Sequence, residues 1–184
     1  AILLQMAAEK EFGPGHHGDL DRLTVTLSHP DGMRALLSGT EVTGHFTAAP
    51  IQELELAKPG IHKLLDSYKI LGQPSTFNVI WTSSKFHDEN PKIYEAFIAS
   101  LDEAIGIINA DRTAAAKTYV KLSGDASNEA LITSILTDPQ VTFTTTPQGI
   151  GQYSDFMSRT GMIKEKAASW KDLFFPNMAG KNGS

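Results

Sequence analysis

Histidine is the side chain that most often binds metals or carries protons near neutral pH, and this chain has six. His16 and His17 stand with Asp19 in the loop GPGHHGD, which offers ligand types for a metal ion. A metal site needs about three or four converging ligands, and no nearby residue completes the set. His62 and His87 are interpreted as surface groups. We therefore expect solvated loop histidines, no metal site and no cofactor.

Two further histidines lie near the ends of predicted strands. His29 follows Leu23–Leu27 (LTVTL), and His45 lies near the end of Val42–Thr47 (VTGHFT). Ligands collect at the carboxyl edge of open α/β sheets, so both histidines are candidates for a binding site. An ordinary packed side chain is an equally good interpretation of His45.

No catalytic constellation stands out in the sequence. Ser83-Ser84 lacks the pattern of a nucleophile elbow, and the chain has no Gly-rich phosphate loop or dinucleotide fingerprint. Adjacent acidic pairs such as Asp102-Glu103 do not face each other on a helix, as an acid/base couple would. We therefore expect a protein that is not an enzyme and has no catalytic residues.

Composition excludes several other classes. The chain has 184 residues, a net charge of −5 and no cysteine, with a pI near 5.6. No basic cluster is long enough to track phosphates, which argues against nucleic-acid binding. No apolar run reaches the roughly 20 residues that span a bilayer. The absence of cysteine rules out disulfides and is compatible with an oxidising compartment.

Strand-like and helical patterns alternate in the first part of the chain, and the later part is mostly helical. This order predicts an α/β fold in which the first two strands are parallel neighbours. The predicted strands are Leu23–Leu27, Val42–Thr47, Ile61–Tyr68 and Phe77–Trp81, with a brief extended piece at Val141–Thr145. The predicted helices are Ala1–Lys10, Gly32–Leu37 (capped by Asp31 and closed by Gly39), Ala48–Leu56, Pro91–Asn109, Arg112–Leu122, Asn128–Leu136 and Ile150–Thr160.

The stretch from Phe77 to Ile108, FNVIWTSSKFHDENPKIYEAFIASLDEAIGII, joins a strand pattern to a long amphipathic helix. Asn90 can cap that helix, and Pro91 suits its first position, where no N–H is needed. The segment KFHDENP and the later ASWKDLFFP (Ala168–Pro176) resemble the solute-binding proteins of bacterial nitrate/sulfonate/taurine-type ABC importers. The resemblance runs from the first residues to about Pro176.

That resemblance implies a type II periplasmic-binding-protein-like fold with two lobes, here without its N-terminal part. Residues 1–72 would form part of one α/β lobe. Residues 73–184 would supply the hinge crossing and the mostly helical part of the other lobe. The protein would be periplasmic, or lipid-anchored and extracellular, although this chain carries no signal peptide. It would capture a small anionic or sulfonate-like organic molecule, or an oxyanion, between the lobes and pass it to an ABC permease in the inner membrane.

In this family the segment after the strand that corresponds to Val42–Thr47 enters the cleft. GHFTAAPIQE (Gly44–Glu53) would therefore supply ligand contacts, although its two alanines before Pro50 depart from the nitrate- and taurine-like versions. A simple helix start at Pro50 is the alternative reading. The predicted ligand-binding residues, expected to share one concave region, are His29, His45, Phe46, Thr47, Gln52, Ser75 and Thr76.

The helical pattern is already under way at Ile2, without a cap. In the family this helix is internal, which implies that the chain is the C-terminal portion of a longer protein. A missing N-terminal segment or a second chain would then complete the fold and part of the pocket. Two alternatives stay open: a pyrimidine-precursor-type binding protein or enzyme on the same fold, with His45 as its candidate residue, and a fragment that binds nothing outside an assembly.

Overall fold

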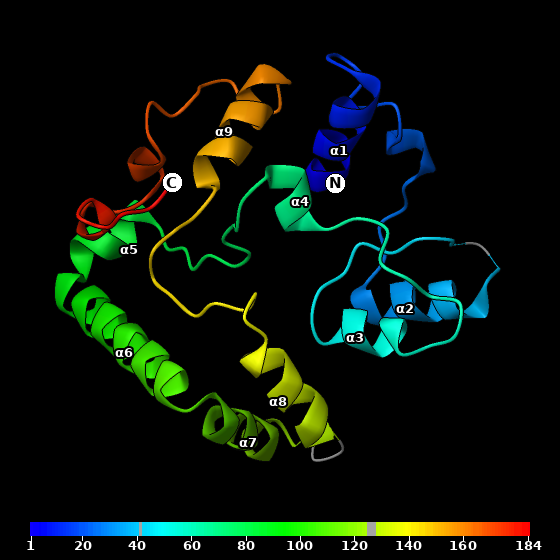
Figure 1. The fold of residues 1–184 in the computed structure, drawn as a ribbon. Helices are drawn as coiled ribbons and strands as arrows, with labels where there is room; N and C mark the ends of the chain where they lie inside the picture. Colours follow the sequence, from blue (N-terminus) through cyan, green and yellow to red (C-terminus); the bar gives the residue numbers. More distant parts are fainter. Residues whose placement is uncertain (41, 125–127) are drawn as a thin grey trace. The chain divides into compact units, whose positions relative to one another are not determined.

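The structure is a computed structural model that describes residues 1–40, 42–124 and 128–184, and all regular secondary structure in these residues is helical (Figure 1). The α-helices are α1 (Ile2–Phe12), α2 (His29–Ser38), α3 (Ile51–Leu56), α4 (Ser67–Leu71), α5 (Ser84–Glu89), α6 (Pro91–Ala110), α7 (Arg112–Ser123), α8 (Glu129–Thr137) and α9 (Ile150–Arg159). The short 3-10 helices are η1 (Asp21–Leu23), η3 (Trp170–Leu173) and η4 (Pro176–Met178).

The predicted α/β, two-lobed fold is wrong for the described residues, because none of the predicted strands forms. Leu23 ends η1, and Thr24 has an extended backbone (φ −101°, ψ 146°) without a strand partner. Val42–Thr47 and Phe77–Trp81 have no regular structure, and Ile61–Tyr68 leads into α4. Alternating apolar residues suit a half-buried pleated surface, but a strand also needs a partner to supply its hydrogen bonds. The pattern alone therefore does not make a sheet.

Several helix predictions are confirmed to within a residue or two, including α6, α7 and α8. The start of α2 differs, because Ser28 rather than Asp31 is its N-cap. The Ser28 hydroxyl accepts a hydrogen bond from the Asp31 N–H at 3.3 Å, so the helix begins at His29. Gly39, with φ +66°, closes α2 as expected. His29 thus lies in the first turn of a helix and not at the end of a strand.

Packing divides the described chain into two compact units. Unit 1 comprises residues 1–24, 65–103 and 144–184, and unit 2 comprises residues 25–64 and 104–143. The predicted boundary between residues 72 and 73 stays a prediction.

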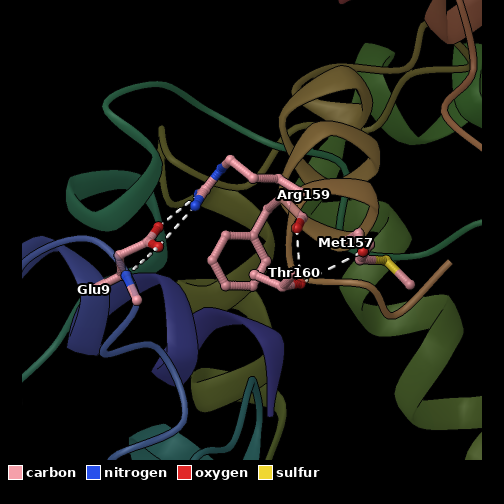
Figure 2. Close-up of polar contacts among 6 residues, drawn as sticks. Glu9, Met157, Arg159 and Thr160 are labelled. Atoms are coloured by element: carbon pink, nitrogen blue, oxygen red, sulfur yellow. Dashed lines mark hydrogen bonds and ion pairs between the residues drawn. The ribbon is translucent and has the colours of Figure 1, made fainter.

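Helices α1, α4 and α9 carry the buried side chains of unit 1. Ala8, Leu71 and Phe156 are 1%, 7% and 3% exposed. Arg159, in the last turn of α9, donates hydrogen bonds of 2.7 and 2.5 Å to the two carboxylate oxygens of Glu9 in α1 (Figure 2). Its guanidinium carbon also lies 5.4 Å from the centre of the Phe156 ring. One bidentate ion pair thus fastens the first helix to the last α-helix of this unit.

The best-packed part of unit 2 is the pair α7 and α8. Ala116, Val120 and Ile132 are 0%, 6% and 6% exposed, and Ile135 and Leu136 pack against them. The alanine lets the two helices approach closely, because its side chain occupies little of the space between them. Burial of the larger apolar groups supplies the stabilisation of the pair.

Arg112, the first residue of α7, holds the C-terminal end of α8. One guanidinium nitrogen donates to the carbonyls of Leu136 and Val141 at 3.0 and 2.7 Å, and the other donates to Asn109 at 3.2 Å. The last carbonyls of a helix have no partner within the helix. Arg112 satisfies one of them while it joins two helices and the loop after α8.

The unpaired strand-like segments keep large apolar side chains on the surface. Trp81, Phe77 and Val25 are 85%, 77% and 68% exposed. The accessible surface is 12567 Å², whereas two separate compact domains of these unit sizes would expose about 10,400 Å² in total, so the chain exposes more surface than is usual for its size.

In the described part of the chain, no helix combines the length and apolar character needed to cross a membrane.

Candidate functional site

Three of the predicted ligand-binding residues lie together in unit 2, around the first turn of α2. The rings of His29 and His45 have their centres 5.8 Å apart. The Thr47 hydroxyl oxygen lies 3.4 Å from Nδ1 of His29. His29 is exposed and Thr47 is half-buried, so both present polar hydrogen-bonding atoms at the surface. We call His29, His45 and Thr47 the histidine cluster.

The ring of His45 is held on two sides. Its Nδ1 lies 2.7 Å from Oε1 of Glu55, a residue of α3 that is only 4% exposed. Its Nε2 faces Gly32 of α2, where a Cβ would lie 2.5 Å from that nitrogen. One ring nitrogen is therefore bonded to Glu55, and the other lies close to the backbone of α2. This arrangement suits a side chain that positions its neighbours better than one that exchanges protons with a solute.

The first turn of α2, which begins with His29, also carries charged groups that bond to one another. Asp31 contacts both the Ser28 hydroxyl and the Arg34 guanidinium. The Ser28 hydroxyl, and then Arg34, hold the pKa of Asp31 below its ordinary value of 3.8. Free N–H groups and the positive end of the helix dipole favour anions at such a position. Asp31 opposes an anion there, and Arg34, whose side chain is 72% exposed, offsets that charge.

Phe46 and Gln52 are close to the histidine cluster in sequence but offer less to a ligand. Phe46 is 49% exposed. The Gln52 side-chain amide donates to Oε1 of Glu53 at 2.7 Å, so one of its two N–H groups is already used. Oε2 of Glu53 is buried and has no hydrogen-bond partner within the described residues. An unpaired buried oxygen is unfavourable, because it has lost its contacts with water.

Ser75 and Thr76 belong to unit 1, so the structure does not join them to the histidine cluster. The Thr76 N–H donates to the carbonyl of Gln148, and the Gln148 N–H donates to the Thr76 hydroxyl, both at 2.8 Å. Ser75 lies against Gly149, which takes the left-handed conformation at φ +71°. The pair therefore positions the turn that begins α9.

Sequence reasoning missed Gly32 and Glu55, the two residues that hold His45. A glycine inside the helical pattern DGMRALLS is a sequence signal of close packing at that position. Glu55 had no comparable signal, because acidic residues in a short helical pattern are ordinarily solvated. Its burial follows from its pairing with His45.

Sequence reasoning also missed a small recess in unit 1. It has a volume of about 280 Å³, and its lining residues are Tyr94, Glu95, Ile98, Ala99, Asp102 and Asn177. The Tyr94 hydroxyl donates to Asn177 at 2.8 Å, and burial raises the pKa of Tyr94 above its ordinary value of 10.0. Beside it, the ring of His87 stacks on Phe175 with their centres 4.1 Å apart. His87, interpreted as a surface group, instead helps to dock the segment before η4.

Within the described residues, no group of three or more histidine, aspartate or glutamate side chains is placed to hold a metal ion. His16 lies 2.9 Å from Asp19 in its loop. His17 instead packs edge-on against Phe156, with the ring centres 6.0 Å apart. The two neighbouring histidines thus engage different partners and do not converge on one point.

Comparisons with family models, curated proteins and solved structures return no match to this chain. The resemblance to solute-binding proteins is therefore an expectation from the sequence motifs, and the chain's own geometry has to support any function.

Proposed function

We propose that the protein binds a small anion, either an oxyanion or a carboxylate- or sulfonate-bearing molecule, and serves as the solute-binding component of an ABC importer. The observation that supports binding is the histidine cluster at the first turn of α2, where His29 and Thr47 offer donors beside a ring fixed by Glu55. The importer assignment rests on the sequence motifs KFHDENP and ASWKDLFFP. It does not rest on the fold.

The roles in the histidine cluster follow from the contacts. His29 and the Thr47 hydroxyl contact the anion, and His45 fixes the segment that carries Thr47. The orientation of His45 is set by Glu55, because a buried carboxylate is stabilised by a hydrogen bond from an imidazole N–H. Arg34 adds positive charge at the same helix end.

Thermal unfolding in the presence of nitrate, sulfate and taurine tests this proposal. A ligand that binds only the folded chain stabilises it by about 2.7 kcal/mol at a concentration of 100 times Kd. We expect at least one of these anions to raise Tm. The same anion should bind at least tenfold more weakly to His29→Ala and Thr47→Val.

His62→Ala is the matched control, because His62 is exposed and lies outside the histidine cluster. It should leave the anion response unchanged. If no anion of the panel raises Tm, or if His62→Ala weakens binding as much as His29→Ala does, the proposed site is wrong. Turnover of a bound solute that persists in His29→Ala and stops in His45→Ala would favour an enzyme instead.

A further inference from the structure

The segment Asn182–Ser184 lies in a slot of unit 1 at the start of α9. The Ser184 N–H donates to the carbonyl of Pro147 at 3.1 Å, and the Ser184 backbone oxygen accepts from the Ile150 N–H at 2.7 Å. Its hydroxyl accepts from the Gly149 N–H at 2.9 Å. Every polar group of Ser184 is thus bonded to the turn 147–150.

Gln148 extends these contacts along the segment. Its side-chain oxygen lies 3.2 Å from the Ser184 hydroxyl, and its side-chain nitrogen donates to the Asn182 carbonyl at 3.3 Å. One glutamine therefore spans the residue between them, contacting the polypeptide on both sides of Gly183.

The position between these contacts admits only glycine. A Cβ on Gly183 would lie 2.6 Å from the carbonyl oxygen of Pro147. It would also lie 2.8 and 2.9 Å from two carbons of the Trp170 ring. The obstacles are backbone and an aromatic ring, which cannot yield as the end of a flexible side chain can. The slot therefore selects a residue without a side chain, followed by serine.

The walls of the slot are held by residues other than the segment that fills it. Two hydrogen bonds of 2.8 Å fix Gln148 to Thr76, and Gly149 lies against Ser75. The N–H groups of the first helical turn have no partner within the helix. In α9 the slot presents the Gly149 and Ile150 N–H groups, which are ready to meet acceptors on an incoming polypeptide.

We propose that the turn 147–150, Thr76 and Trp170 form a recognition slot for a Gly-Ser segment of polypeptide, which Gly183-Ser184 fills as a reversible intramolecular ligand. The slot lies in unit 1 and does not depend on the solute proposed above. Lys181 tethers the segment through Thr145, with its Nζ 2.5 Å from the Thr145 hydroxyl. A tethered segment has an effective concentration of about 1–10 mM. A free peptide must therefore be tested in that range.

The test uses the full chain with Trp81→Phe, so that Trp170 is the fluorescent reporter. Gly183→Ala should expel the segment. We expect amide hydrogen exchange at Gly149 and Ile150 to become at least tenfold faster and Trp170 emission to shift to longer wavelength. Gly180→Ala is the matched control, because a Cβ there meets nothing within 4 Å, and both readouts should stay unchanged.

Ser184→Ala is a milder second variant. It removes the hydroxyl and keeps the backbone, so exchange should accelerate at Gly149 while Ile150 stays protected by the Ser184 carbonyl. This pattern separates a local release from a loss of folding. Equal acceleration at both amides, or at neither, would overturn the assigned contacts.

Recognition in trans is the decisive step. The acetylated and amidated peptide Lys-Asn-Gly-Ser, at millimolar concentration, should restore protection of Ile150 in the Gly183→Ala variant. The peptide Lys-Asn-Ala-Ser should not. If neither peptide protects Ile150, or if both do so equally, the slot does not recognise Gly-Ser and the proposal is wrong.

Discussion

Glu9 and Arg159 stand 150 positions apart in the sequence, and both carboxylate oxygens of Glu9 accept hydrogen bonds from the guanidinium of Arg159 (Figure 2). The bond from Arg159 is the main cause that holds the pKa of Glu9 below its ordinary value of 4.5. Burial opposes that shift, and the Gly15 N–H, which also donates to this carboxylate, supports it. The pair joins the first and the last sequence segments of unit 1.

Arg159→Met should lower stability at pH 7 and flatten its dependence on acid pH. Because the folded pKa of Glu9 is lowered, its contribution is present above pH 4.5 and is lost as the pH falls through the lower folded value. Urea titrations between pH 7 and pH 3 measure this. Arg34→Met is the control, because its partner Asp31 lies on the same helix and also bonds to Ser28. Equal losses of stability in the two variants would show that the long-range pair stabilises the fold no more than the local pair does.

Gly32→Ala should destabilise the protein by about 1–3 kcal/mol, because a Cβ at 2.5 Å from Nε2 overpacks against the His45 ring. Glu55 prevents that ring from moving freely. Gly106→Ala, at a helical glycine of α6 with nothing within 4 Å, should instead stabilise by about 0.5–1 kcal/mol. Chemical denaturation measures both. The same sign for both substitutions would contradict the packing of His45 on α2.

Ile132→Ala should destabilise the α7–α8 pair by about 2–4 kcal/mol, since Ile132 is only 6% exposed and packs within the small core of that pair. Leu122→Ala removes an equally large apolar side chain from α7, where it is 80% exposed. Its effect should stay within about 0.5 kcal/mol. Thermal or denaturant unfolding measures the stability of both variants. Similar losses of stability would mean that the assigned α7–α8 core does not stabilise the protein more than its surface does.

Arg112→Lys should destabilise by about 1–3 kcal/mol even though the charge is kept. The planar guanidinium reaches Leu136, Val141 and Asn109 together, and a single ammonium group cannot reproduce that set of bonds. Arg22→Lys, at an exposed position, is the control and should be neutral. A neutral Arg112→Lys would show that these bonds are weak or replaceable.

Helices could be read from the sequence where the relevant interactions are local. The apolar spacing after Pro91 and the Gly39 stop both predicted observed features, because caps and helical periodicity act within a few residues. Strands could not be read from LTVTL or FNVIW, because pairing depends on partners elsewhere in the chain. The sequence of those segments therefore does not show whether their backbone carbonyls and amides will find strand partners.

The sequence named three residues that lie together in unit 2, although they come from two separate segments. His29, His45 and Thr47 were proposed for a strand edge and instead meet at the start of a helix, so their proximity has a different cause from the one expected. Glu55 is buried and Tyr94 is half-buried, and neither carried a sequence pattern that marks its partner. Ser75 and Thr76 were assigned to a ligand and instead hold the turn before α9.

The span of contacts has a consequence for the order of folding. Arg112 and Leu136 are 24 positions apart in the sequence, whereas Glu9 and its partner Arg159 are 150 positions apart. Local contacts close faster than distant ones, because less chain entropy is lost in bringing their ends together. During synthesis the α7–α8 pair can therefore form early, whereas α1 has no ion-pair partner until Arg159 has been made. Until then α1 can pack on α4, but the part of its surface that α9 covers stays exposed.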